Sequence, residues 1–146
     1  SSTFRQIMEI RKKEKTVVQD RTIYEDAYIF AANLHDMNLL STRDFDNYLS
    51  VFELMTSFME GPDLLIYLKA SVPTLVANIQ KRGRKYEESI RLDYLRSLND
   101  KYNDWISKYN HGKLLVVDVD NIDFENKPED MASIVEKINA QLHGLF

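Results

Sequence analysis

Charged side chains at three places along the chain are suited to chemistry, and each place lies at or beyond the end of an aliphatic run. The first is Asp20-Arg21-Thr22, the second is Arg82-Gly83-Arg84, and the third is the acidic loop Asp118–Phe124. An arginine guanidinium binds phosphate or hydroxyl oxygens, and a carboxylate can hold a hydrated magnesium ion. These residue types therefore suit the binding of a phosphorylated ligand.

Each cluster also has a simpler interpretation. Asp20 and Arg21 could only cap a helix and pair with each other, and the motif alone leaves both interpretations open. Arg82 and Arg84 could form the solvated basic end of a helix, and for so short a motif this interpretation is favoured. The acidic loop has no calcium or zinc ligand spacing, so a solvated loop is favoured over a metal site.

The elements that must position these clusters alternate between short aliphatic runs and longer helical patterns, which predicts an α/β fold. Strands are predicted at Lys15–Gln19, Asp63–Ala70 and Lys113–Asp118. In a parallel sheet of this kind, ligands bind at the carboxyl ends of the strands. The three charged clusters follow such ends or lie beyond them.

Helices are predicted between the strands. Thr22 and Glu25 form a capping box that begins a helix over residues 23–37, and a second helix is predicted over residues 42–60. A third helix is predicted to begin at Ser71. A fourth carries an apolar stripe and has its C-terminal cap at Gly112; the stripe consists of Leu95, Leu98, Tyr102, Trp105 and Tyr109. The last helix is predicted to begin at Pro128.

Composition limits the class of protein. The chain has 146 residues, 44% of them hydrophobic, which suits one core in one domain. The absence of cysteine excludes disulfides and thiolate metal sites, and it predicts a reducing cytoplasm. A net charge of −4 argues against binding to nucleic acid or an anionic membrane. The sequence lacks an initiator Met and opens in a helical pattern, so we expect a truncated chain.

Taken together, these stretches resemble the deoxynucleoside kinase family, which includes deoxyadenosine, deoxyguanosine and deoxycytidine kinases. Val17–Ala31 resembles the strand–turn–helix with the family's Asp/Glu-Arg-Ser motif, and Pro62–Ala70 resembles its fourth strand. Arg82–Glu87 resembles the family's LID, and Asp118–Phe124 its adenine-binding loop. The similarity covers nearly all of the chain in the right order.

The resemblance implies a doubly wound parallel sheet of the P-loop nucleoside-kinase type, with the first two strands absent from this chain. Residues 1–146 would form the C-terminal part of a single kinase domain. The phosphate loop Gly-x-x-x-x-Gly-Lys-Ser/Thr does not occur in the sequence, and the resemblance places it before Ser1. This chain alone is therefore expected to be inactive.

The resemblance also implies roles for the nucleoside side of the site. Arg21 would bind the 5′-hydroxyl region and the transferring phosphate, and Asp20 would hold Mg²⁺ through water. Phe30 would stack on the base, and Asp26 would orient the group that reads the polar edge of the base.

On the ATP side, the resemblance implies that Arg82 and Arg84 close on the phosphates. On the substrate side, Glu87 would hold the 3′-hydroxyl of the nucleoside sugar. Asp123 and Phe124 would line the adenine of ATP through backbone contacts.

The function implied is ATP-dependent phosphorylation of the 5′-hydroxyl of a deoxynucleoside in nucleotide salvage. Asp26 favours deoxyadenosine, followed by deoxyguanosine or deoxycytidine. The alternatives are another P-loop kinase, such as a thymidylate kinase, and a non-catalytic dimerising scaffold. Helices 23–37 and 42–60 carry more apolar surface than one sheet face requires, which predicts a homodimer through them.

Overall fold

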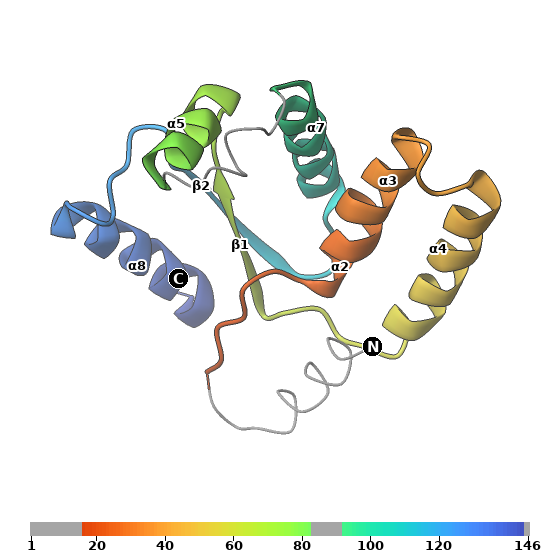
Figure 1. The fold of residues 1–146 in the computed structure, drawn as a ribbon. Helices are drawn as coiled ribbons and strands as arrows, with labels where there is room; N and C mark the ends of the chain where they lie inside the picture. Colours follow the sequence, from red (N-terminus) through yellow and green to blue (C-terminus); the bar gives the residue numbers. More distant parts are fainter. Residues whose placement is uncertain (1–15, 83–91, 145–146) are drawn as a thin grey trace. The chain divides into compact units, whose positions relative to one another are not determined.

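The computed structural model describes residues 16–82 and 92–144, which form helices and a pair of parallel strands (Figure 1). The chain divides into two compact units, residues 1–55 and 56–146, and each is considered by itself. In chain order the elements are α2 (Ile23–Glu25), η1 (Asp26–Ala31), α3 (Ala32–Asp36), α4 (Thr42–Thr56), β1 (Leu64–Lys69), α5 (Val72–Arg82), α7 (Leu92–Lys108), β2 (Lys113–Asp118) and α8 (Pro128–His143). Within the described residues, no helix is long and apolar enough to cross a membrane.

The first unit begins with a helical stretch made of α2, η1 and α3. Its start is fixed by the Thr22 N–H, which donates to the Glu25 carboxylate at 3.0 Å. This is one of the two bonds of the predicted capping box; the other is not formed, because the Thr22 hydroxyl makes no capping hydrogen bond. Glu25 is only 7% exposed. The predicted helix 23–37 is confirmed, but its middle six residues form a π-helix, which the sequence pattern does not predict.

An aromatic cluster around Phe52 holds α4 to this stretch. The Phe52 ring lies edge-to-face with Tyr24 and Tyr28, at centroid distances of 6.2 and 5.6 Å, and it stacks with Tyr48 at 6.3 Å. Phe52 is 5% exposed. Each aromatic pair of this kind adds roughly 0.5–1.5 kcal/mol beyond the burial of apolar area. The cluster therefore joins α4 to the core of the first unit, which also includes the fully buried Ile29.

Helix α4 ends earlier than the predicted helix 42–60. Its last residue is Thr56, whose carbonyl accepts a hydrogen bond from the Met59 N–H at 3.0 Å in a closing turn. The chain must turn here because Gly61-Pro62 leads into β1, and the conformation before a proline is not helical.

The second unit is built on the parallel pair β1 and β2, in register from Leu64 opposite Lys113 to Lys69 opposite Asp118. The strands predicted at 63–70 and 113–118 are confirmed. Tyr67 of β1 stacks with Tyr102 of α7 at 6.0 Å. Burial raises the pKa of Tyr67, so its hydroxyl remains a donor. Helix α8 packs against β2 and begins at the predicted Pro128.

The strand predicted at Lys15–Gln19 is wrong for the described residues 16–19, which form no strand. Val18 is 92% exposed. A strand needs a neighbour for its backbone hydrogen bonds, and the sheet of the described residues consists of β1 and β2 alone. Residues 16–19 therefore carry the aliphatic pattern of a strand, but no neighbouring strand of the described residues supplies the backbone hydrogen bonds that a strand needs.

Gly112 is not the cap of the long helix, because α7 ends at Lys108. Instead it enters β2 with φ 153°, and a Cβ there would lie 3.0 Å from the Pro62 carbonyl oxygen. A Cβ on Gly61 would overlap the carbonyl oxygen of His111. The segments that enter the two strands therefore approach more closely than side chains allow, and glycine is required.

We expect Gly61→Ala to destabilise the protein by about 1–3 kcal/mol, because the new methyl group forces the two strand entries apart. Gly144→Asn is the control, since nothing lies within 4 Å of a Cβ there and asparagine tolerates the left-handed backbone. Urea unfolding measures both free energies. Equal unfolding free energies for the two variants would contradict the close approach.

A second stability prediction concerns the aromatic cluster. Phe52→Ala should cost about 3–5 kcal/mol, because it removes the ring that three tyrosines contact. The matched control is Phe58→Ala, since that ring is 74% exposed. If urea unfolding gives both alanine variants the same free energy, Phe52 is not the centre of the core.

Candidate functional site

Arg21 and Phe30, two of the residues predicted to bind substrate, lie together. The guanidinium carbon of Arg21 is 5.1 Å from the centroid of the Phe30 ring, which is a cation–π contact. Arg21 has φ 63°, a left-handed conformation that is uncommon for any residue except glycine and recurs at functional sites. The turn at Arg21 thus returns its side chain toward the helix that follows.

Asp26 is the first residue of η1 and is exposed. Its charge acts on Tyr48 of α4: burial of the ring, followed by the negative charge of Asp26, raises the pKa of the Tyr48 hydroxyl. Tyr48 therefore remains neutral and near the carboxylate. The sequence pattern gave no sign of this role, because Tyr48 falls on the apolar stripe of its helix and only its hydroxyl suggests another function.

The backbone between these residues departs from the regular α-helix. Both Asp26 and Phe30 belong to the six-residue π-helix, a conformation found frequently at functional sites. Asp20, directly before Arg21, is exposed and lies in a bend. The first unit therefore presents a carboxylate, a guanidinium and a half-buried aromatic ring along one short stretch. This set can stack a planar ring and bind an anionic or hydroxyl group.

In the second unit, Arg82 is the last residue of α5 and is exposed. The neighbouring Lys81 pairs with Glu125 at 3.4 Å, so part of the basic charge at this helix end is balanced. Arg84 and Glu87, also predicted as site residues, lie outside the described residues.

The loop after β2 is held by its own side chains. The Asp123 carboxylate accepts hydrogen bonds from the backbone and side-chain N–H groups of Asn126, at 3.1 and 3.0 Å, and these bonds lower the pKa of Asp123. The Asp123 N–H donates to Asp130 at 2.9 Å, and its carbonyl accepts from Lys127 at 2.8 Å. Asp123 is thus bound within the loop by backbone and side chain, and Phe124 beside it is half-buried.

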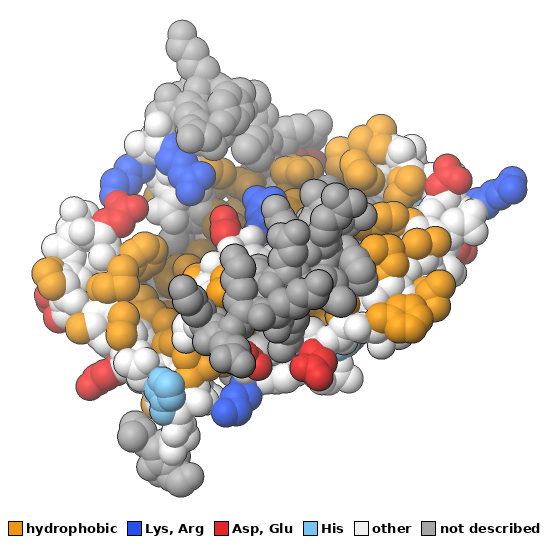
Figure 2. All heavy atoms as spheres, turned by 90° about the horizontal axis from the view of Figure 1, so that it is seen from below, with side chains coloured by type: hydrophobic (Ala, Val, Ile, Leu, Met, Phe, Trp, Pro, Cys, Tyr) orange, Lys and Arg blue, Asp and Glu red, His pale blue; other side chains and the backbone are white. Residues whose placement is uncertain are grey.

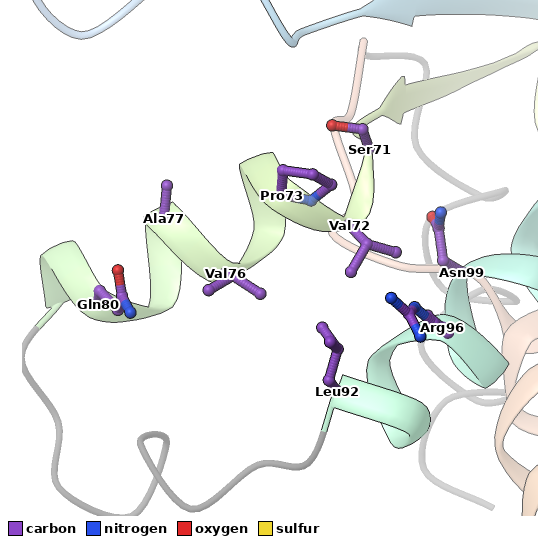
Figure 3. Close-up of a pocket in the computed structure, with 9 residues that line it drawn as sticks. All are labelled: Ser71, Val72, Pro73, Val76, Ala77, Gln80, Leu92, Arg96 and Asn99. Carbon is purple, nitrogen blue, oxygen red and sulfur yellow. The ribbon is translucent and has the colours of Figure 1, made fainter.

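A groove of about 630 Å³ runs between α5 and α7 (Figure 3). Val72 and Val76 of α5 and Leu92 of α7 form its apolar part, and Arg96 and Asn99 add polar groups from α7. Among the residues that the structure describes, none of those predicted to bind substrate or ATP lines it.

The described residues contain no group of three or more His, Cys, Asp or Glu side chains that converge on a metal position. A cation near Asp20 would need further oxygen ligands from a bound phosphate or from water. That donor set suits magnesium, which keeps several waters and is often bound through one or two carboxylates.

Comparison with known proteins gives the family. A family model described as deoxynucleoside kinase matches residues 1–143. A deoxyadenosine/deoxycytidine kinase of Bacillus subtilis is 33% identical over 90% of this chain and 65% of its own length. A deoxyadenosine kinase of Dictyostelium discoideum is 34% identical over 93% of this chain and 54% of its own length. The chain thus spans about half to two thirds of these relatives.

A solved structure agrees. Deoxyadenosine kinase from M. mycoides, with the products dCMP and a flexible dCDP bound, superposes with a TM-score of 0.77 at 26% identity. The match covers 95% of this chain and 69% of the other. The predicted resemblance and the predicted α/β fold of the P-loop nucleoside-kinase type are confirmed by these matches. Because the family model covers nearly the whole sequence, the chain belongs to the deoxynucleoside kinase family.

Proposed function

We propose that the protein to which this chain belongs transfers the γ-phosphate of ATP to the 5′-hydroxyl of a deoxynucleoside. Membership of the deoxynucleoside kinase family supports the reaction type. The relatives named as deoxyadenosine, deoxyguanosine and deoxycytidine kinases support a deoxynucleoside as acceptor. Phosphoryl transfer depends mainly on positioning and on positive charge, and the charged residues described above are of this kind.

The contact between Arg21 and Phe30 carries the proposal. A nucleoside has a planar base at one end and the reacting hydroxyl at the other. Phe30 offers a stacking surface, and Arg21, 5.1 Å from that ring, offers the charge for the hydroxyl and phosphate end. One ligand can therefore contact both side chains. On binding, the guanidinium would leave the ring for the phosphate, where its charge is better used.

The remaining roles are proposals of the same kind. Asp20 would hold Mg²⁺ through water, and Arg82 with Arg84 would neutralise charge on the transferring phosphate. Glu87 would bind the 3′-hydroxyl of the sugar. The ATP adenine would lie against the loop at Asp123 and Phe124.

For the base, we propose deoxyadenosine first, then deoxyguanosine or deoxycytidine. Asp26 supplies carboxylate oxygens that accept hydrogen bonds, directly or through another group, and an exocyclic amine is the complementary donor. The nearby Tyr48 hydroxyl, whose pKa is raised, stays protonated at neutral pH and adds a second polar group at this place.

We also propose a homodimer through helices 23–37 and 42–60. Exposed hydrophobic side chains are visible as orange atoms in Figure 2. Those on these segments include Leu34, Val51 and Leu54, which are 44%, 57% and 62% exposed. Uncovered apolar surface of this kind marks an interaction site. A second copy of the chain is the simplest partner, because a twofold interface uses the same patch twice.

Activity is to be measured on the protein expressed from its complete coding sequence, with ATP and each deoxynucleoside, and with dTMP to test the thymidylate kinase alternative. We expect 5′-monophosphate products from deoxynucleosides. Arg21→Lys should lower kcat/KM about 100-fold, because lysine cannot form the paired hydrogen bonds. Arg96→Lys, at an exposed position of α7 that lines the groove beside α5, should leave kcat/KM unchanged. Full activity of the Arg21 variant, or dTMP as the better acceptor, would refute the proposal.

Oligomeric state is tested by light scattering at micromolar concentration, where we expect twice the monomer mass. Leu54→Glu should shift the mass toward the monomer, since a charge would be buried in the interface. Met131→Glu is the control, because Met131 is an exposed apolar residue on α8, which is not one of the proposed interface helices. A monomeric wild type, or equal effects of the two substitutions, would rule out this interface.

A further inference from the structure

The loop between β2 and α8 runs beside α5 (Figure 1). Both ends of the loop make hydrogen bonds or ion pairs with residues of the β1–α5 segment. At its start, the Val119 N–H donates to the Lys69 carbonyl at 2.9 Å and so continues the ladder past the last strand pair. At its far end, Glu125 pairs with Lys81 near the end of α5. The path of the loop is therefore set by α5 as well as by β2.

The shortest of these contacts is made by Asp120. Its carboxylate accepts a hydrogen bond of 2.8 Å from the Ser71 N–H, at the residue directly before α5. The Ser71 backbone bond, followed by one from the Thr74 hydroxyl, lowers the pKa of Asp120. The first N–H groups of a helix lack partners within the helix and favour a negative charge. Asp120 supplies that charge from a residue 49 positions away in sequence.

The ion pair between Lys81 and Glu125 is expected to stabilise the loop less than the hydrogen bond of Asp120. The Lys81 and Glu125 side chains are 67% and 69% exposed, and their separation is 3.4 Å. Exposed pairs of long side chains are screened by solvent and contribute little. Asp120 is also exposed, but its short side chain loses less conformational freedom when it bonds the Ser71 backbone N–H, and its own N–H donates to Asp118 at 3.0 Å. Of the contacts between the loop and the β1–α5 segment, we therefore expect the Asp120 hydrogen bond to Ser71 to hold the loop in place.

Asp120 is three residues before Asp123 and four before Phe124 in the same loop. A hydrogen-bonded turn, from the Ile122 N–H to the Val119 carbonyl at 3.3 Å, connects Asp120 to them. Asp123 is itself hydrogen-bonded to Asn126 and Asp130, so the loop is held both before and after the turn at residues 119–122.

We propose that Asp120 is a positioning residue for the phosphate donor: by holding the loop to the first turn of α5, it sets the place of the backbone at residues 123–124, and hence the affinity for ATP. This inference rests on the proposed function, in which that backbone lines the adenine. Asp120 does not touch the reacting atoms. Its effect should therefore appear in ATP binding and not in the chemical step.

The test uses Asp120→Ala in the protein from the complete coding sequence, with steady-state kinetics and calorimetric titration of ATP. We expect KM and Kd for ATP to rise about fivefold, as for the loss of one hydrogen bond of ordinary net strength at an exposed site. The kcat at saturating ATP and the KM for the deoxynucleoside should stay unchanged. Asp120→Asn should recover part of the affinity, because its carbonyl oxygen still accepts from Ser71. Asp100→Ala removes an exposed carboxylate from α7 and serves as the control.

The outcomes separate the two proposals. Wild-type activity with an unchanged ATP affinity in Asp120→Ala would overturn the positioning role alone. A fall in kcat and a rise in both KM values, with a lower unfolding temperature, would also overturn it, because that result indicates a general structural role. If the wild type binds ATP in an Asp120-dependent way but phosphorylates no deoxynucleoside, the inference stands and the proposed acceptor is wrong. A wild type that binds no ATP would overturn both proposals.

Discussion

Parallel pairing of β1 with β2 is the constraint on which the second unit depends. Because the strands run in the same direction, both leave the sheet at the same edge, where Lys69 lies opposite Asp118. The segments that follow, Ser71 and the loop with Asp120, are thereby brought within hydrogen-bonding distance. An antiparallel pair would place these segments at opposite edges. The loop proposed to bind adenine and the start of α5 are neighbours for this reason.

The first unit depends on a different balance. Its backbone departs from regular geometry twice within eleven residues, at the left-handed Arg21 and in the π-helix that ends at Ala31. A left-handed residue with a side chain costs roughly 1–2 kcal/mol. The tyrosines packed on Phe52 and the buried Glu25 hold the stretch in place and offset that cost. Both departures occur next to residues proposed to bind substrate, as is common where geometry serves function.

Much of the fold follows from the sequence, since β1, β2, α5 and α8 are set by local signals. The aliphatic run at 113–118, the proline at 128 and the cap at Ser71 act within a few residues of each other. Residues 16–19 carry the same kind of signal without forming a strand, because pairing requires a second segment. The π-helix was not predictable, since six residues are too few to distinguish its period from that of an α-helix.

For the candidate site, too, some residues could be predicted from the sequence and others could not. Residue types suggested Arg21, Phe30 and Asp26, and the first two are brought into contact. The partners that lie far apart in sequence gave no signal: Tyr48 near Asp26, and Ser71 bound to Asp120. Such pairs are decided by tertiary packing, which a pattern along the chain does not record. Arg84 and Glu87 lie outside the described residues, so their predicted roles remain predictions.

The glycines at the entry of the two strands have a consequence for mutational surveys of this protein. Gly61 and Gly112 lie at the amino-terminal edge of the strand pair, and Ser71 and Asp120 lie beyond the opposite edge. A strand of six residues separates the two groups. Substitutions at the first edge should therefore reduce the yield of folded protein at constant specific activity, whereas those at the second should alter specific activity at constant yield. Mutations at the two edges of the strand pair should therefore lower activity for different reasons. A screen that measures only total activity would not tell the two kinds of mutation apart.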